Sequence, residues 1–447
     1  MEQKGFSTLG KDLLMGKAKK GSDNFNSFNV KELDKPITIP TTDSKISVLV
    51  IPSDSSGVGK YRSIDPHKML HKLYGDEFYI DINPNPDYAD KNYFKRFAIV
   101  HIHKAPSNDY TNGVKIVNDL KALGCKVIVD NDDYWGIEST NSQYKVMKLN
   151  KTDEKFREIM QAADWVTTTT PIFADEIRGF NKNVVVIPNS IDPSEPQFIP
   201  KPVKSDRIRI GFLGGSTHFE DLRLMNGVPN VFLSIRDKIQ MVLIGFDLRG
   251  KIKQQMKDGT VKSRDMRPEE TIWAEYEKLF TSNWQLLSEY PDYARHLQTY
   301  TQNKYEGEKT MPYRRIWTRD INNYAHNYNH LDISLAPLVE NKFNLFKSQL
   351  KVVEAGFHKK ALIAQDFGAY TLDLTNVFDG SKINPKGNAI LIDSRKNHKQ
   401  WAQSIKRLIN NPEIIQMMGE NLNEMVMDRF DLTKVTKTRA EFYRSII

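Results

Sequence analysis

Early in the chain, a short glycine-containing segment carries residue types that bind phosphate. Pro52–Arg62 (PSDSSGVGKYR) follows an apolar run and contains Gly57 and Gly59. Glycine permits close backbone approach, so the amides of this turn are suited to cradle a phosphate at the start of the next helix. Arg62 adds a guanidinium able to fork onto an oxyanion. The segment is neither a Walker A loop nor a full G-x-G-x-x-G turn, so a plain strand-to-helix turn stays an alternative.

A second glycine turn lies near the middle of the chain. Gly211–Leu222 (GFLGGSTHFEDL) places Gly214 and Gly215 after another apolar run, with His218 at the start of the next helix. A phosphate at that helix N-terminus would have His218 as a donor. A capped helix with an exposed histidine explains the same residues.

A third segment, Leu335–Gly356, combines a lysine with a later glutamate. The pattern predicts a helix that begins near Lys347 and Ser348, where the lysine charge adds to the helix dipole and suits a diphosphate. Glu354 comes seven residues after Lys347 and is therefore expected on the same helix face, able to accept hydrogen bonds from ribose hydroxyls. Surface charges on an ordinary amphipathic helix are the alternative.

Acidic and histidine side chains gather at the ends of two further runs. Val129–Gly136 (VDNDDYWG) contains Asp132 and Asp133, which are suited to general-base catalysis or to Mg²⁺ binding. His101 and His103 are expected on opposite faces of a sheet, with His101 as the buried structural histidine.

Short apolar runs rich in Val and Ile must position these motifs. Runs that are apolar throughout suit strands covered on both faces, and therefore a parallel sheet flanked by helices. The first series comprises Ile46–Ile51, Ala98–His103, Lys126–Asp130, Trp165–Thr168 and Val184–Ile187. The second comprises Arg209–Leu213, Gln240–Gly245, Asp332–Pro337, Ala361–Ala364 and Ala389–Ile392.

These two series predict an α/β protein with two doubly wound, Rossmann-like domains facing a cleft. Residues 1–44 are a polar lead-in, expected to be loosely ordered, and 45–200 form the N-terminal domain. Residues 206–395 form the C-terminal domain, with an insertion at about 249–310, and residues 396–447 are C-terminal helices.

Composition excludes several classes of protein. The chain has 447 residues, a formal net charge of +8 and a single cysteine, Cys125. It therefore cannot form an internal disulfide or a cysteine-based zinc site. With no long apolar stretch and no secretory apolar core, we expect a cytoplasmic protein without an integral membrane segment.

Taken together, the motifs resemble a GT-B glycosyltransferase of the nucleotide-sugar-dependent family 4. The resemblance rests on SSGVGKYR, VHIHKAP, ADWVTTTTPIFADEIRGFNKNVVVIPNSID, IRIGFLGGSTHFEDL and LDISLAPLVENKFNLFKSQLKVVEAG, and it spans nearly everything after Ser47. It implies that Gly57 and Gly59 approach the donor diphosphate and that His103 lies near the donor sugar. It also implies that Lys347 and Ser348 meet the diphosphate and that Glu354 holds the ribose.

Two departures from the family pattern are visible. Phe346 stands where the family has an earlier glutamate, and the usual Arg-x4-Lys phosphate pair is replaced by GGSTHFED. Glu340 or Asn344 is the candidate substitute for sugar recognition, and His218 for the phosphate contact.

The resemblance predicts a hexosyltransferase-like enzyme that uses a UDP- or GDP-sugar as its donor, requires no further cofactor, and retains the anomeric configuration. Its catalytic residues would be His103, Asp132 and Lys347, with Asp132 and Asp133 as acceptor-side polar groups and no metal ion required. The donor-binding set would be Gly57, Gly59, Arg62, Gly214, Gly215, His218, Asn344, Lys347, Ser348 and Glu354. The acceptor stays open among a glycan, a protein, a small molecule and modified DNA. A nucleotide-sugar epimerase of the same fold, or a catalytically silent nucleotide- or carbohydrate-binding protein, are the alternatives.

Overall fold

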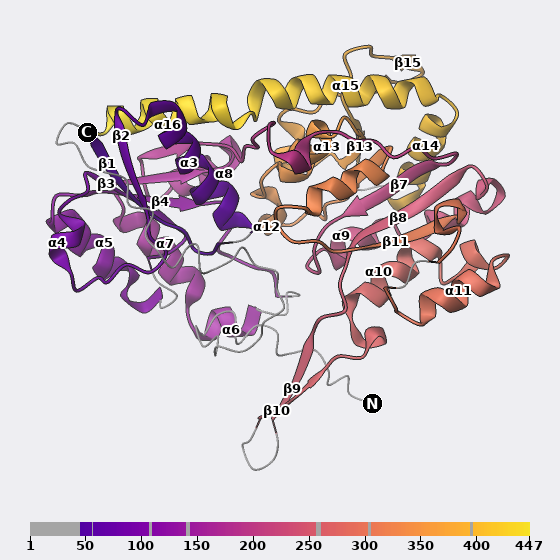
Figure 1. Ribbon diagram of the computed structural model, residues 1–447, viewed down its shortest axis with the longest axis horizontal. Coiled ribbons are helices and arrows are strands. Elements are labelled where there is room, and N and C mark those ends of the chain that lie inside the picture. The colour runs from indigo at the N-terminus through magenta and orange to yellow at the C-terminus, as the bar shows by residue number, and fades with distance from the viewer. Residues whose placement is uncertain are drawn as a thin grey trace. The chain divides into compact units, whose positions relative to one another are not determined.

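A computed structural model of the chain describes residues 45–447 except 56, 107–109, 140–143, 256–260, 303–304 and 394–396. The predicted lead-in, 1–44, lies outside the described residues. The chain divides into two compact units (Figure 1). Unit 1 comprises the described chain up to Asp192 together with Asn341–Gln349 and Asp428–Ile447, and unit 2 comprises Pro193–Glu340 and Leu350–Met427.

Unit 1 is built on a six-stranded parallel sheet with the order β2-β1-β3-β4-β5-β6. Its strands are β1 (Ile46–Ile51), β2 (Phe78–Ile82), β3 (Ile99–His103), β4 (Lys126–Asn131), β5 (Trp165–Thr168) and β6 (Val184–Val186). Helices cover both faces, which is why the strands are apolar throughout rather than alternating.

Successive residues of the unit 1 strands enter two separate hydrophobic clusters. Val100 packs in one cluster with side chains of α5 (Gly113–Ala122), α7 (Thr152–Ala162) and α8 (Pro171–Arg178). Ile99 packs in the other with side chains of α3 (Asp65–Tyr74) and the C-terminal helix α16 (Leu432–Ser445). The remaining helical segments of the unit are η1 (Lys60–Ile64), α4 (Lys91–Phe94), η2 (Tyr110–Asn112), α6 (Tyr144–Leu149) and α12 (Lys342–Leu345).

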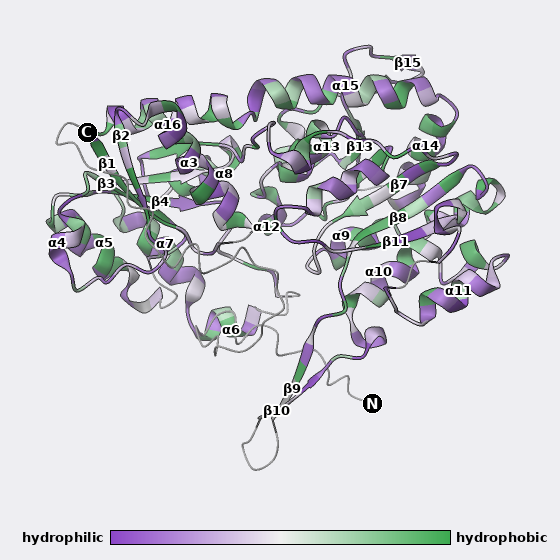
Figure 2. Cartoon of the chain, viewed as in Figure 1, coloured by the Kyte–Doolittle hydropathy of each residue, from purple (hydrophilic) through white to green (hydrophobic). Residues whose placement is uncertain are grey.

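Unit 2 repeats this architecture with a parallel sheet of order β11-β8-β7-β12-β13-β16. The strands are β7 (Ile208–Leu213), β8 (Ile239–Phe246), β11 (Tyr313–Trp317), β12 (Ile333–Ala336), β13 (Ala361–Gln365) and β16 (Ile390–Ile392). Hydrophobic residues run along β8, which is buried for most of its length (Figure 2).

The helices of unit 2 include α14 and α15, which with α16 form the helical C-terminal region that the sequence predicts. Its α-helices are α9 (Phe219–Arg223), α10 (Ile272–Thr281), α11 (Pro291–Gln298), α13 (Leu350–Phe357), α14 (Asn397–Ile409) and α15 (Pro412–Arg429). The shorter turns are η3 (Pro196–Phe198), η4 (Pro229–Ile235), η5 (Pro268–Glu270), η6 (Gln285–Leu287), η7 (Glu308–Thr310), η8 (Tyr324–His330) and η9 (Gly368–Thr371). Small antiparallel pairs are formed by β9 (Lys251–Gln255) with β10 (Val261–Asp265), and by β14 (Phe378–Asp379) with β15 (Lys382–Ile383).

Every strand expected from the sequence is present, within one residue at each end. Two strands of the large sheets were missed. β2 contains Asp81 and β11 contains Arg314 and Arg315, so neither shows an uninterrupted apolar run. Arg315 is accepted in β11 because the buried Glu277 neutralises it through two hydrogen bonds of 2.8 and 2.6 Å.

The stretch expected as an insertion, about 249–310, contributes to the core of unit 2. Its first part forms the β9–β10 hairpin, but α10 buries Trp273, Tyr276 and Phe280 in the main hydrophobic cluster. This segment therefore supplies a covering helix of the sheet as well as the hairpin.

The units also differ in extent from the expected sequence ranges. The last helix, α16, packs against α3 of unit 1, where His67 and Tyr443 are hydrogen-bonded at 2.7 Å. Residues 341–349 likewise belong to unit 1. Among the residues that the structure describes, no helix combines the length and apolar character needed to cross a bilayer.

Candidate functional site

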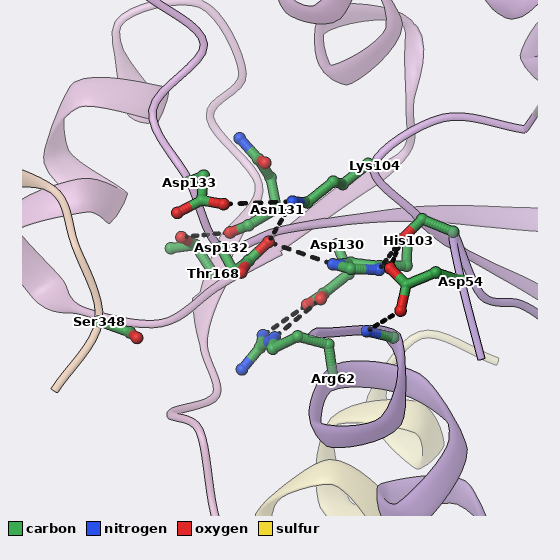
Figure 3. A network of polar contacts seen from close by, with 12 residues as sticks. Asp54, Arg62, His103, Lys104, Asp130, Asn131, Asp132, Asp133, Thr168 and Ser348 are labelled. Atoms are coloured by element: carbon green, nitrogen blue, oxygen red, sulfur yellow. Dashed lines mark hydrogen bonds and ion pairs between the residues drawn. The ribbon is translucent and has the colours of Figure 1, made fainter. Parts of the chain in front are cut away.

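The carboxyl ends of the unit 1 strands bring together polar side chains from several elements (Figure 3). Ser53 follows β1, His103 ends β3, and Asp130 lies near the end of β4. Because parallel strands end at the same edge of the sheet, residues far apart in the chain meet there, at the edge where open α/β sheets bind ligands.

His103 is fully buried and held at both ring nitrogens. Its Nδ1 lies 2.8 Å from Ser53 Oγ, and its Nε2 lies 3.2 Å from Asp132 Oδ1. His101 and His103 lie on the same face of the sheet, because side chains two residues apart in a strand point the same way. The expectation of opposite faces was wrong.

Lys104 connects the two aspartates that follow β4. Its Nζ lies 3.4 Å from Asp132 and 3.2 Å from Asp133 (Figure 3). Burial by itself would raise the pKa of Asp132, but Lys104 and His103 outweigh burial and hold that pKa below its usual range. Asp132 is therefore an ionised, buried carboxylate. Among the residues described, no group of three or more His, Cys, Asp or Glu side chains is placed to hold a metal ion.

Arg62 forms a buried ion pair with Asp130. Its Nε and Nη2 donate to the two carboxylate oxygens at 2.9 and 2.5 Å, and its Nη1 donates to Ile187 O at 2.6 Å and to Asn189 Oδ1 at 3.2 Å. The guanidinium thus points into the protein, and its two parallel N–H donors bind the carboxylate of Asp130. Asn189 in turn donates to Ser348 Oγ at 3.0 Å, which ties the 341–349 segment to this network.

In the first glycine turn, the Asp54 carboxylate accepts a hydrogen bond from a backbone amide of the same turn. The Gly59 amide donates to Asp54 Oδ1 at 3.2 Å, and Ser53 Oγ donates to Asp54 Oδ2 at 2.8 Å. Gly57 has a φ of +53°, which favours glycine. A Cβ at Gly59 would lie 2.0 Å from Asp54 O, so only glycine fits there.

His101 belongs to a second buried group, on the side of α3 and α16. Its Nδ1 lies 3.1 Å from the Tyr443 hydroxyl, which also contacts His67 Nε2 at 2.7 Å. Burial is the main reason why the pKa of His101 falls to about 3. This placement agrees with its predicted role as a structural histidine.

In unit 2, Gly214 and Gly215 follow β7, and His218 immediately precedes α9. His218 Nδ1 lies 2.9 Å from Asp221 Oδ2. The backbone N–H of His218 donates to Tyr276 Oη at 2.8 Å. The other oxygen of Asp221 accepts the Val339 amide at 2.9 Å. Asp221 thereby links the ends of β7 and β12.

Lys347 and Ser348 precede α13, which begins at Leu350 rather than near Lys347. The argument that Lys347 shares a helix face with Glu354 therefore does not hold. Lys347 Nζ lies 5.5 Å from the centre of the Phe343 ring. Asn344, in α12, is buried, and its amide donates to the N-cap Asn341 at 2.7 Å.

Phe346 packs into the hydrophobic core of unit 1. Its ring centre lies 4.9 Å from that of Tyr134 and 5.3 Å from that of Phe173, and the residue is 4% exposed. An aromatic anchor thus stands where the family pattern has a polar glutamate.

Glu354 is buried in α13, where tyrosines from η8 hold both of its carboxylate oxygens. Tyr324 donates to Oε1, and Tyr328 donates to Oε2 at 2.9 Å. Neutral donors rather than a cation thus satisfy this carboxylate.

The structure brings His103 and Asp132 into contact. Arg62, Gly59 and Ser348 lie in the surrounding hydrogen-bond network. Sequence reasoning missed Ser53, Asp54 and Lys104, which complete it. The sequence did offer a signal, because Ser53 and Asp54 lie directly after a strand that was expected. Tyr324 and Tyr328 had no such signal, since η8 shows no periodicity that relates it to α13.

Comparison with models of known protein families finds no match. A comparison with curated protein sequences finds none either. Solved structures do match over most of the chain. HepE (Alr3699) from Anabaena, crystallised with UDP, matches with a TM-score of 0.55 and 11% identity, over 90% of this chain and 100% of that chain.

Two further structures match over a similar extent. The catalytic domain of starch synthase IV from Arabidopsis thaliana, bound to ADP and acarbose, has a TM-score of 0.54 and 10% identity, over 90% of this chain and 99% of that chain. A glycosyltransferase from Rickettsia africae has a TM-score of 0.51 and 14% identity, over 91% and 99%.

The two parallel sheets, the covering helices and these similarities show that the chain has the GT-B fold. At this level of identity the resemblance establishes the fold. It makes the chain similar in architecture to nucleotide-sugar glycosyltransferases.

Proposed function

We propose that the chain is a glycosyltransferase that moves a sugar from a nucleotide-diphosphate sugar to an acceptor hydroxyl. The observation that carries the proposal is the His103–Asp132 pair at the carboxyl end of the unit 1 sheet, in a fold whose solved neighbours were crystallised with UDP, UDP-glucose or ADP. A buried histidine in contact with an ionised carboxylate, beside an exposed hydroxyl, is an arrangement that is common at functional sites.

Each proposed residue has a physical role. Lys347 supplies a positive charge that stabilises the leaving diphosphate as its charge develops. The Ser348 hydroxyl contacts the same diphosphate. Glu354 accepts hydrogen bonds from the ribose, while Tyr324 and Tyr328 fix the orientation of its carboxylate. His103 lies near the donor sugar, and Asp132 fixes its ring.

The glycine turns and their neighbours have supporting roles in this proposal. Gly57, Gly59, Gly214 and Gly215 permit close approach of the donor, and His218 or Asn344 supplies a further polar contact. Arg62, whose guanidinium pairs with Asp130, positions the network rather than touching the donor.

A catalytically silent nucleotide- or carbohydrate-binding protein is the second candidate. The observation in its favour is Phe346, which is buried in the core of unit 1. The family pattern has a glutamate at this position, so a polar contact with the nucleotide sugar is lost.

One assay separates the candidates. Purified protein is incubated with a panel of UDP-, GDP- and ADP-sugars, with and without an acceptor mixture, and free nucleoside diphosphate is measured. Acceptor-dependent release supports the transferase. Binding of a nucleotide sugar without any turnover supports the silent protein, and conversion of the sugar without diphosphate release indicates an epimerase.

A further inference from the structure

A second buried arginine of unit 1 lies outside the candidate site. Arg439 belongs to α16, which packs against α3 (Figure 1), and the residue is 1% exposed. Within the described part of the chain, its one hydrogen bond is a long contact of 3.5 Å from Nη1 to the Tyr443 hydroxyl, and its Nε has no partner. No carboxylate of the described residues forms an ion pair with it.

The other three arginines that are buried in the described residues are all neutralised in one way. Arg62, Arg209 and Arg315 each direct Nε and Nη2, which lie on one edge of the guanidinium, at a carboxylate at 2.5–3.0 Å. The carboxylates belong to Asp130, Asp332 and Glu277. The Nε edge of Arg439 therefore has the geometry that binds an anion, but no protein carboxylate in the described residues faces it.

The neighbours of Arg439 do not supply the missing negative charge. Tyr443 Oη lies 2.7 Å from His67 Nε2 and 3.1 Å from His101 Nδ1. Burial raises the pKa of Tyr443 to about 12, so its hydroxyl is neutral. Burial also lowers the pKa of both histidines, so their rings are neutral as well. An arginine stays protonated in proteins, and this group therefore carries one uncompensated positive charge.

The nearest carboxylate of unit 1 is already neutralised. Asp130 acts on the titration of His67, His101 and Tyr443, but its own carboxylate pairs with Arg62 at 2.5 Å. A buried charge without a counter-ion is strongly destabilising. The charge of Arg439 thus calls for a partner that does not come from the described side chains.

Two hydroxyl groups in the same buried layer also lack partners. Ser63 Oγ and Thr436 Oγ1 are buried and form no hydrogen bond with the described residues. Thr436 lies one helical turn before Arg439 on α16, and the Ser63 carbonyl contacts His67 Nδ1 at 2.6 Å. A hydroxyl can donate to an anion or to water. Water would satisfy the hydroxyls, but it would leave the charge of Arg439 uncompensated.

We infer that the Nε edge of Arg439 binds a small monovalent inorganic anion, of the size of chloride, between α16 and the unit 1 sheet. One negative charge neutralises the single unpaired guanidinium. The anion is small because the surrounding side chains are 0–4% exposed, which excludes a nucleotide or a sugar. The anion would hold α16 on unit 1, and the inference does not depend on the proposed transferase activity.

The experiment measures thermal unfolding of the full chain in gluconate, chloride and bromide at one ionic strength. Gluconate is too large for the site, so it serves as the reference anion. Arg439→Gln removes the charge, and Arg439→Lys keeps the charge but loses the edge with two donors. The control is Arg444→Gln, from an exposed arginine of the same helix that pairs with Glu77 at 2.6 Å.

We expect the melting temperature of the wild type and of Arg444→Gln to rise by about 2–5 °C for each tenfold increase in halide concentration above Kd. Arg439→Gln should show no such rise, and Arg439→Lys should need about 10-fold more halide, as for loss of a hydrogen bond to a charged group. The same halide response in Arg439→Gln and in the wild type would overturn the inference, because the effect would then be a general one of the salt.

Crystals of the wild type grown in bromide give a direct test that needs no variant. Anomalous scattering should place a bromide ion beside Arg439 Nε. If this position holds water or no scatterer in bromide, the inference is wrong even if Arg439→Gln fails to fold. A bromide ion found only at exposed arginines such as Arg444 would overturn it in the same way.

Discussion

The two units hold the carboxylates near their strand ends in different ways. In unit 1, Asp130 is buried against the Arg62 cation, and Asp132 is buried against the Lys104 cation and the ring of His103. In unit 2, Glu354 is held by tyrosine hydroxyls, and Asp221 accepts a backbone amide and contacts His218.

The difference has an energetic meaning. A buried charge that loses a charged partner is left uncompensated, whereas a carboxylate that loses one neutral donor keeps the others. We therefore expect unit 1 to tolerate changes at its strand ends poorly. The carboxylate of Glu354 loses less when one of its neutral tyrosine donors is removed. It is therefore better suited to exchange a tyrosine hydroxyl for a hydroxyl of a ligand.

The largest effect should follow loss of the Asp130 carboxylate. Asp130→Ala leaves the Arg62 guanidinium buried without its partner, which should cost about 3–5 kcal/mol of unfolding free energy. Denaturant titration measures this loss. The control is Asp133→Ala, whose side chain is 42% exposed and which should cost less than about 1 kcal/mol. Equal costs for the two variants would contradict the contrast between buried and exposed charge.

Lys347→Ala should lower donor turnover about 10²-fold, because one preorganised positive group is lost from the leaving diphosphate. Steady-state kinetics with the donor identified in the panel measures kcat. Lys342→Ala is the matched control from the same segment, since Lys342 is exposed and pairs with Glu176 at 2.8 Å. If both variants keep normal turnover, Lys347 has no part in catalysis.

Unit 1 should also lose stability on mild acidification. Burial lowers the pKa of His101 to about 3. Asp130 acts in the opposite direction and raises this pKa, whereas Arg439 and Arg62 lower it further. The unfolded chain takes up a proton below about pH 6.5, whereas the folded chain does not until about pH 3, so stability falls as the pH decreases through that window.

At pH 5 this loss amounts to about 2 kcal/mol for His101. His101→Asn removes the titrating group, so its stability should change less between pH 7 and pH 5 than that of the wild type. Denaturant titrations at the two pH values test this. The same slope in both proteins would show that His101 is not the source.

The smallest effect should follow changes around Glu354. Glu354→Gln should raise the donor KM about 10-fold and change kcat less, if the carboxylate only binds the ribose. Tyr328→Phe removes one neutral donor and should cost only about 1 kcal/mol of stability. An unchanged KM in Glu354→Gln would remove this residue from the donor site.

The strands could be predicted from the sequence because a strand buried on both faces must be apolar throughout. β2 and β11 could not, since Asp81 and Arg315 are accepted only through partners elsewhere in the chain. Asp81 accepts from Tyr93 at 2.9 Å, and Arg315 pairs with Glu277. Such partners leave no periodic signal.

The site was partly predictable for the same reason. His103 ends an expected strand and Asp132 follows another, so their position at one edge of the sheet could be inferred. The assignment of Arg62 to a ligand could not anticipate Asp130 as its partner, 68 residues away in the chain. The start of α13 was also misplaced, because Phe346 draws the preceding segment into the core of unit 1.

The sequence by itself determined the two parallel sheets and which residues stand at their strand ends, because local apolar runs and turn residues act over a few positions of the chain. Only the tertiary structure decided which charges neutralise one another, which carboxylate closes the Gly59 turn, and to which unit α16 belongs. Those outcomes depend on contacts between segments distant in sequence, where burial makes an unpaired charge too costly and so selects its partner.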